Sequence, residues 1–155
     1  MFTNERMLIS MNILLFLTPK DNIAYIYSDF TLRQTLEKME HNKYSAVPII
    51  DRDGRYAGTI TEGDILWTIK NELSLSIKKA EKVPIMSIER KMDNLPVRID
   101  TGMEELITMA TNQNFVPVVD DRGVFIGIVT RKDIIKYIYS KTKAVVYSEL
   151  KADNK

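Results

Sequence analysis

Apolar positions along the chain alternate between the spacing of strands and the spacing of a helix, and one succession of these elements occurs twice. In the first half it predicts a leading strand, a helix, two strands joined by a turn, and a second helix, at residues 23–27, 31–40, 46–50, 55–60 and 62–71. In the second half the same elements are predicted at residues 95–99, 103–110, 115–119, 124–129 and 131–139. Each half is therefore expected to be a β-α-β-β-α unit, and the fold class to be mixed α/β (α+β).

The second succession is a copy of the first, because identical residues recur at a constant distance. Val47-Pro48 recurs as Val116-Pro117, and Gly58, Thr61 and Asp64 recur 69 positions later as Gly127, Thr130 and Asp133. A repeat of about 60 residues is marginally stable alone, so the two repeats are expected to pack together with pseudo-two-fold symmetry. The predicted organisation is an N-terminal segment with a short helix, repeat 1, a linker, repeat 2 and a polar tail, at residues 1–21, 22–72, 73–93, 94–140 and 141–155.

The N-terminal apolar run, residues 8–17, is ten residues long, and a membrane helix needs about 20. Thr18-Pro19 follows it in place of a small-residue cleavage site, so a short docked helix and a cytoplasmic protein are expected. The sequence leaves open whether Met1 or Met11 is the natural start.

The composition excludes several classes of function. Lys and Arg number 22 against 21 Asp and Glu, a formal net charge of +1, which argues against a direct nucleic-acid partner. There is no cysteine and one histidine, His41, so neither a thiolate nor a histidine-rich metal site can form. The same shortage leaves no activated nucleophile, which disfavours an enzyme.

Two motif copies carry a family resemblance. Gly58-Thr59-Ile60-Thr61-Glu62-Gly63-Asp64 and Gly127-Ile128-Val129-Thr130-Arg131-Lys132-Asp133 share the form G-h-x-T-x-x-D, where h is apolar, and each follows a Val-Pro strand and a turn. With the paired β-α-β-β-α pattern, these residues resemble the CBS-domain pair, or Bateman module, over residues 22–140. The resemblance implies binding of an adenine nucleotide between the repeats and signalling to a protein partner. Tyr44-Ser45-Ala46-Val47-Pro48 is also similar to small stand-alone bacterial pairs that bind cyclic di-AMP.

The resemblance implies two clefts, each mixing strands of one repeat with the T-x-x-D of the other. Site A would combine Asn22, Ile23, Ala24, Tyr25, Tyr44, Ser45, Ala46 and Pro48 with Ile128, Thr130, Arg131 and Asp133. Site B, the weaker one, would combine Leu95, Val97, Phe115, Val116 and Pro117 with Thr59, Thr61, Glu62 and Asp64.

The motif has a physical reading of its own. Its threonine begins a helix, where backbone N–H groups attract an anion, and its aspartate, one turn on, can accept hydrogen bonds from a ribose. Thr-x-x-Asp is also a helix capping pattern that contributes about 1 kcal/mol without a ligand. Capping does not explain Gly58 and Gly127, since glycine within a strand usually marks the close approach of another group.

The two sites differ in charge. After its threonine site A has Arg131-Lys132, suited to phosphate, whereas site B has Glu62-Gly63. A carboxylate repels a phosphate charge 4 Å away by about 1–4 kcal/mol, so site A is expected to be the occupied one. Asn22 stands where the cyclic di-AMP binders have a lysine, and Asp133 is present where those often lack it. Both departures favour a mononucleotide.

These observations favour a non-enzymatic sensor of AMP, ADP or ATP that needs no cofactor, forms a homodimer and signals to an unidentified protein. A cyclic di-AMP receptor of the same fold and a ligand-free dimerisation scaffold remain alternatives. Tyr137, Tyr139, Met86 and Ile88 are candidates for a dimer face, and Trp67 for the core or a subunit contact.

Overall fold

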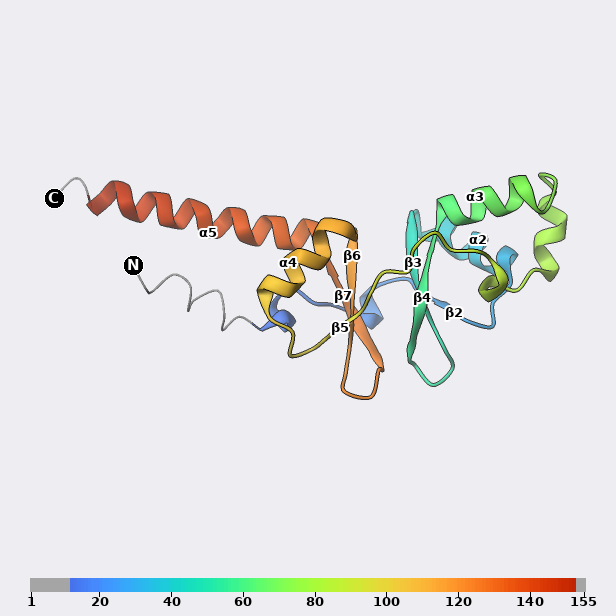
Figure 1. Ribbon diagram of the computed structural model, residues 1–155, viewed down its shortest axis with the longest axis horizontal. Coiled ribbons are helices and arrows are strands. Elements are labelled where there is room, and N and C mark those ends of the chain that lie inside the picture. The colour runs from blue at the N-terminus through green and yellow to red at the C-terminus, as the bar shows by residue number, and fades with distance from the viewer. Residues whose placement is uncertain (1–11, 153–155) are drawn as a thin grey trace.

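Two units of the same plan make up the computed structural model, which describes residues 12–152 (Figure 1). Repeat 1 consists of β2 (Ile26–Tyr27), α2 (Leu32–Asn42), β3 (Ala46–Ile50), β4 (Tyr56–Thr61) and α3 (Glu62–Asn71). Repeat 2 consists of β5 (Val97–Arg98), α4 (Met103–Asn112), β6 (Phe115–Val119), β7 (Phe125–Thr130) and α5 (Arg131–Ala152). The linker holds two 3-10 helices, Ile77–Lys82 and Ile85–Ser87. The predicted tandem β-α-β-β-α fold is confirmed.

Strand pairing repeats with the sequence. In repeat 1, β2 lies parallel to β3 and β3 lies antiparallel to β4; β5, β6 and β7 pair in the same way. Ala46 pairs with Thr61, and Phe115, 69 positions later, pairs with Thr130. The two sheets differ at one edge, where β1 (Thr18–Pro19) adds to β7 and makes the second sheet four-stranded.

Each repeat has its own hydrophobic core. Val47, Ile60 and Ile65 lie in one cluster, and the corresponding residues of repeat 2 lie in the other, namely Val116, Val129 and Ile134. The β-branched strand residues and the apolar side of each helix pair supply these clusters, as the apolar spacing predicts. The linker also contributes to the first core: Ile88, a candidate for the dimer face, is buried there, so it does not belong to an exposed face.

The repeats meet through their strand hairpins, and the contact is two-fold symmetric. The Tyr56 N–H donates to the Gly123 carbonyl at 3.3 Å, and the Phe125 N–H donates to the Gly54 carbonyl at 2.9 Å. Tyr56 and Phe125 are corresponding residues, and their rings stack with centroids 6.2 Å apart. The pseudo-two-fold axis therefore passes between these hairpins.

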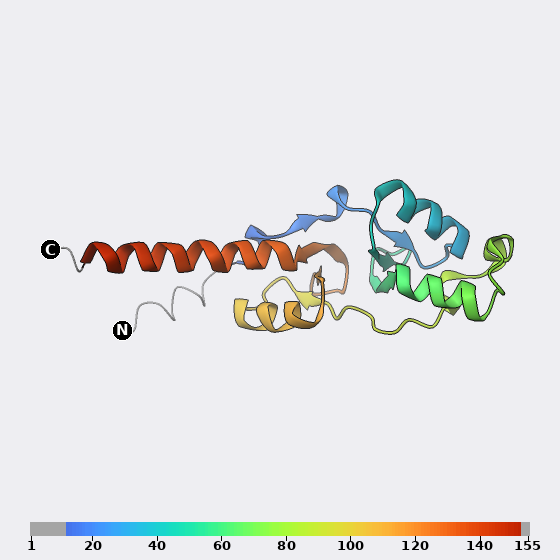
Figure 2. The same ribbon diagram turned by 90° about the horizontal axis from the view of Figure 1, so that it is seen from above.

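Both ends of the described chain belong to repeat 2. A 3-10 helix, Ile13–Leu15, buries Ile13 in the second core, and the rest of the helix predicted before it lies outside the described residues. Phe16 packs on Tyr137 with ring centroids 4.9 Å apart. α5 continues to Ala152, well beyond the expected end near Tyr139, and its outer half projects away from the body (Figures 1 and 2). No helix within residues 12–152 is long and apolar enough to cross a membrane.

Candidate functional site

Each G-h-x-T-x-x-D motif lies at a junction where a strand passes directly into a helix. At the start of α3 the Thr61 hydroxyl accepts from the Asp64 N–H at 3.1 Å, while Asp64 Oδ2 accepts from the Thr61 N–H and hydroxyl at 3.0 and 2.8 Å. At the start of α5 the Thr130 hydroxyl donates to Asp133 Oδ2 at 2.6 Å and accepts from the Asp133 N–H at 3.2 Å. Both motifs therefore cap their helices, as the capping interpretation predicts.

The two aspartates differ in how many carboxylate oxygens are left to accept a hydrogen bond from a ligand. Asp64 is 6% exposed, and its second oxygen, Oδ1, accepts from the Lys91 N–H of the linker at 3.0 Å. Asp133 is half-buried, and within residues 12–152 no donor reaches its Oδ1. One carboxylate oxygen thus remains for a hydroxyl donor at the start of α5, whereas both oxygens are occupied at the start of α3.

The two parts of site A meet where the N-terminal segment crosses onto repeat 2. Thr18 pairs with Ile128, and Pro19 pairs with Gly127. A 3-10 helix, Lys20–Asn22, follows, with Asn22 exposed, and then the half-buried Ile23, Ala24 and Tyr25 lead into repeat 1. The segment that carries the first residues of site A is therefore hydrogen-bonded to the strand that carries Ile128 and Thr130.

The other residues of site A lie beside the helix of their own repeat. Ala46 pairs with Thr61, and the Ser45 carbonyl accepts from the Glu62 N–H at 2.9 Å. Tyr44 and Ser45 are exposed, Ala46 is half-buried and Pro48 is buried. Strand register thus brings these residues next to T-x-x-D of repeat 1, and no pairing joins them to that of repeat 2 among the described strands.

The Arg131 side chain has hydrogen-bond partners that the sequence did not predict. Its Nε donates to the carbonyls of Ala110 and Gln113, at 2.7 and 3.2 Å, and so caps the C-terminal end of α4. A cation there is favourable because the last carbonyls of a helix carry partial negative charge. Because Nε is occupied, the Arg131 side chain could contact a phosphate only through its Nη atoms.

A second cation lies beside site A. The Lys20 ammonium is 5.0 Å from the centre of the Tyr25 ring, and this ring meets Tyr27 edge-on at 5.7 Å. Desolvation raises the pKa of the Tyr25 hydroxyl, and its hydrogen bond with Tyr27 raises it further. The Arg52 guanidinium carbon lies 3.8 Å from the centre of the Tyr27 ring, and Arg52 also pairs with Asp29. These contacts fix the position of the Tyr27 ring, against which Tyr25 packs.

At site B the linker occupies the space beside β4. Asp93 Oδ1 accepts from the Thr59 N–H at 2.8 Å, and a Cβ on Gly58 would lie only 2.6 Å from this oxygen. The Tyr56 hydroxyl bonds Thr59 Oγ1 at 2.7 Å and donates to the Asn94 carbonyl at 2.6 Å. The group that closely approaches Gly58 is therefore the protein's own carboxylate.

The remaining site B residues belong mostly to the second repeat's sheet. Val97, Phe115, Val116 and Pro117 are buried, while Leu95 is exposed and exchanges backbone hydrogen bonds with the Gln113 side chain. The sequence reading missed Asp93 and Asn94. The sequence does contain one signal for them, because an Asp-Asn pair spans the start of both repeats, at 21–22 and 93–94.

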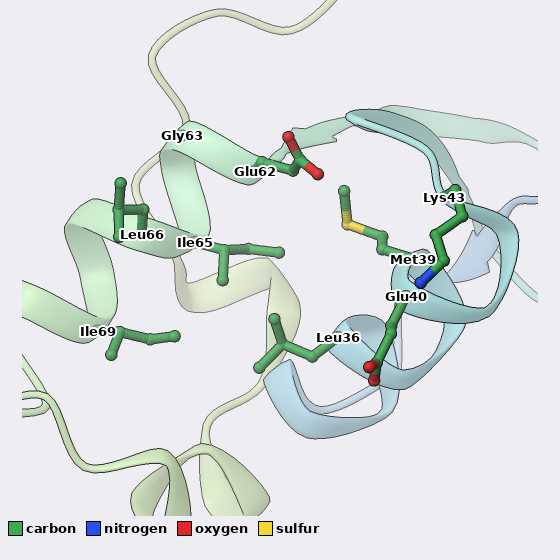
Figure 3. Close-up of a pocket in the computed structure, with 9 residues that line it drawn as sticks. All are labelled: Leu36, Met39, Glu40, Lys43, Glu62, Gly63, Ile65, Leu66 and Ile69. Atoms are coloured by element: carbon green, nitrogen blue, oxygen red, sulfur yellow. The ribbon is translucent and has the colours of Figure 1, made fainter.

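A groove of about 790 Å³ lies elsewhere, between α2 and α3 of repeat 1 (Figure 3). Apolar side chains of the two helices face one another across it, and two carboxylates and one ammonium lie at its rim. The lining residues are Leu36, Met39, Ile65, Leu66 and Ile69, with Gly63, and Glu40, Lys43 and Glu62 at the rim. Residues 12–152 contain no cluster of three or more His, Asp or Glu that could hold a metal ion.

The family model for the CBS domain matches residues 16–71 and 85–140, so the chain belongs to the CBS domain family and carries two copies of the domain. It is 29% identical over 139 residues to the uncharacterized protein MJ1426 of Methanocaldococcus jannaschii, covering 72% of this chain and 83% of that protein. It is 25% identical over 122 residues to cyclic di-AMP receptor B of Bacillus subtilis, with coverage of 78% and 82%. The crystal structure of CBSX2 of Arabidopsis thaliana in complex with AMP superimposes with a TM-score of 0.68 at 26% identity, covering 86% and 99%.

Proposed function

We propose that this protein is a non-enzymatic regulatory module that binds an adenine nucleotide at site A. The observation that carries the proposal is the contrast between the two aspartates. Asp133 keeps one oxygen without a donor in the described chain, at a helix start, whereas Asp64 is buried with both oxygens engaged. A ribose hydroxyl supplies the donor that Asp133 Oδ1 lacks.

The surroundings suit the rest of a nucleotide. The N–H groups of Arg131 and Asp133 at the start of α5 already donate, to the Asn114 carbonyl at 3.0 Å and to Thr130 Oγ1 at 3.2 Å. The positive end of the helix dipole and the Lys20 ammonium beside Tyr25 are what attract the phosphate. Ile23, Ala24 and Tyr25 provide half-buried apolar and aromatic surface for the adenine, which is how a pocket with few polar groups gains affinity. AMP, ADP and ATP share this chemistry and differ in the number of phosphate charges.

Occupancy of site A would be transmitted through the contact between the repeats. That contact includes two backbone hydrogen bonds, the Tyr56–Phe125 stack and the hydrogen bond from the Tyr56 hydroxyl to the Asn94 carbonyl. A nucleotide that touches both repeats can bias their relative angle. A protein partner would sense this change, and the module would act as a homodimer. The AMP complex of the Arabidopsis relative supports an adenine ligand for the fold.

Cyclic di-AMP is the second candidate ligand. The name of the Bacillus relative, cyclic di-AMP receptor B, favours it. Asn22 disfavours it, because the residue offers no positive charge to a second phosphate.

Isothermal titration calorimetry tests the proposal with AMP, ADP, ATP and cyclic di-AMP. We expect one ligand per chain, with Asp133→Asn weakening binding about tenfold or more, since a hydrogen bond to a charged group contributes about 1.5–3 kcal/mol. Asp64→Asn is the matched control: it should lower the unfolding midpoint and leave nucleotide affinity nearly unchanged. Absence of heat with all four ligands would reject the proposal in favour of a scaffold. Loss of binding in Asp64→Asn alone would move the ligand to site B.

A further inference from the structure

The two repeats differ in how the chain leaves their second helix. α3 ends at Asn71, whereas α5 continues through the corresponding stretch to Ala152. Ser74 and Leu75 follow α3 with φ of 49° and 62°, in the left-handed region. This conformation is unfavourable for residues that carry a Cβ, and it persists only where the surrounding structure holds it. Repeat 1 therefore ends in a strained turn where repeat 2 continues as a helix.

A hydrogen bond and two buried side chains hold this turn. The Leu75 N–H donates to the Ile69 carbonyl near the end of α3 at 2.9 Å. Leu73 before the turn and Ala80 after it are both buried in the first hydrophobic core. The turn is therefore fixed from both sides, and its side chains are presented to solvent from a defined backbone.

The side chains that the turn presents are apolar. Leu75 and Ile77 are 69% and 64% exposed. We call residues 74–82 the linker tip, and it lies at the end of the described molecule opposite the outer half of α5 (Figures 1 and 2). Two exposed aliphatic side chains on a strained and anchored turn have the form of a contact surface.

The charge of the linker tip is positive. Lys78, Lys79 and Lys82 are exposed on it, directly after the apolar pair. Glu81 is its acidic residue, and the Glu81 carboxylate is paired with Arg33 of α2. The chain as a whole has a formal net charge of only +1, so this positive charge is a local feature. The linker tip thus combines protruding aliphatic side chains with lysines.

This combination is complementary to the surface of an anionic membrane. Acidic headgroups attract lysines, while aliphatic side chains at an exposed tip can enter the boundary between headgroups and acyl chains. Two copies that met tip to tip would bring their lysines together, which is unfavourable. A single-stranded nucleic acid would pair with the lysines but stacks its bases on aromatic side chains, and residues 74–82 contain none.

We infer that the linker tip binds the surface of membranes that contain anionic lipids. Leu75 and Ile77 enter the headgroup layer, and the lysines that follow contact the headgroup phosphates. The contact is peripheral, and salt weakens it because mobile ions screen the attraction. This inference does not depend on nucleotide binding.

Co-sedimentation of the full-length chain with lipid vesicles tests the inference. We expect binding to vesicles of phosphatidylcholine mixed with phosphatidylglycerol, and none to vesicles of phosphatidylcholine alone. The double variants Leu75→Ser with Ile77→Ser and Lys78→Glu with Lys79→Glu should each weaken binding about tenfold or more. All four residues are exposed, so the variants should keep the wild-type midpoint of urea unfolding.

Two matched controls make the same changes elsewhere. Leu15→Ser removes a side chain that is 70% exposed, as Leu75 is 69% exposed, from the 3-10 helix that packs on repeat 2. Lys141→Glu with Lys143→Glu reverses two exposed charges on the outer half of α5. Both controls should bind the mixed vesicles as the wild type does.

Three results would overturn the inference. The first is a chain that stays in the supernatant with the mixed vesicles at low salt. The second is a loss of binding in the α5 double variant as large as that in the Lys78, Lys79 variant, which would show attraction spread over all lysines. The third is unchanged binding in the Leu75, Ile77 variant, which would exclude insertion of the tip. If the tip variants instead weaken a dimer in sedimentation equilibrium and vesicles have no effect, the tip contacts a second copy and the inference is equally refuted.

Discussion

Replacement of Asp93 by alanine should destabilise the protein much more than loss of a similar ion pair at the surface. Asp93 Oδ1 accepts from the N–H of Thr59, a residue that is 1% exposed, and the carboxylate pairs with Arg90 at 2.8 and 3.2 Å. A buried donor without an acceptor costs about 1–3 kcal/mol. The Arg90 side chain is 14% exposed and also loses its partner, which adds only about 1 kcal/mol because the Asp93 side chain is 40% exposed, so we expect a total of about 2–4 kcal/mol.

Urea denaturation followed by circular dichroism measures this difference. Asp29→Ala is the matched control, because Asp29 also forms a two-bond pair with an arginine, Arg52, but both side chains are more than half exposed. An exposed pair contributes about 0–1 kcal/mol. If Asp93→Ala costs no more than Asp29→Ala, the linker carboxylate does not hold the strand and the account of site B is wrong.

A double-mutant cycle with Gly58 separates the two roles of Asp93. Gly58→Ala should destabilise the wild type, because the new Cβ would lie 2.6 Å from Asp93 Oδ1 and the residue has φ of +148°. In an Asp93→Ala background the steric part of this cost disappears and the backbone strain remains. Purely additive effects would show that the carboxylate does not occupy the space in front of Gly58 in solution.

Two further stability effects follow from the contacts between the repeats and at the N-terminus. Burial raises the pKa of Tyr56, so its neutral form stabilises the fold up to about pH 10, where an unfolded tyrosine ionises, and this stability is lost as the pH rises further. Tyr56→Phe should lower the free energy of unfolding at neutral pH by about 1–2 kcal/mol, since the Asn94 carbonyl loses its donor. It should also reduce the loss of stability above about pH 10. Urea titrations that show the same alkaline loss in the variant as in the wild type would contradict this. Gly127→Ala should detach β1, because its Cβ would lie 2.3 Å from the Thr18 carbonyl oxygen, and faster amide hydrogen exchange at Ile128 would report the loss, whereas wild-type protection would refute it.

The repeat itself is what made most of the fold predictable. Identical residues 69 positions apart require the two sheets to share one register, and Ala46–Thr61 and Phe115–Thr130 do pair alike. The glycine in each second strand indicated a close approach, and the structure identifies the approaching groups as Asp93 and the Thr18 carbonyl. Both belong to segments that precede a repeat.

Features without periodicity escaped prediction. β1 has only two residues, too few to show an alternation, and its partner lies more than a hundred positions away. α5 continues past Tyr139 through residues 140–152, which contain no proline or glycine. The lysines there indicated a polar tail, although no helix breaker occurs. The sequence predicts a phosphate ligand at Arg131 because a helix start attracts anions, but the carbonyls at the end of α4 compete for its Nε.

A crystal structure of the protein grown with saturating AMP tests the central claim most directly. The account predicts difference density for one nucleotide per chain, with a ribose hydroxyl within hydrogen-bond distance of Asp133 Oδ1 and the phosphate at the start of α5. Density beside Asp64, density in the α2–α3 groove, or an empty α5 start at full saturation would contradict it.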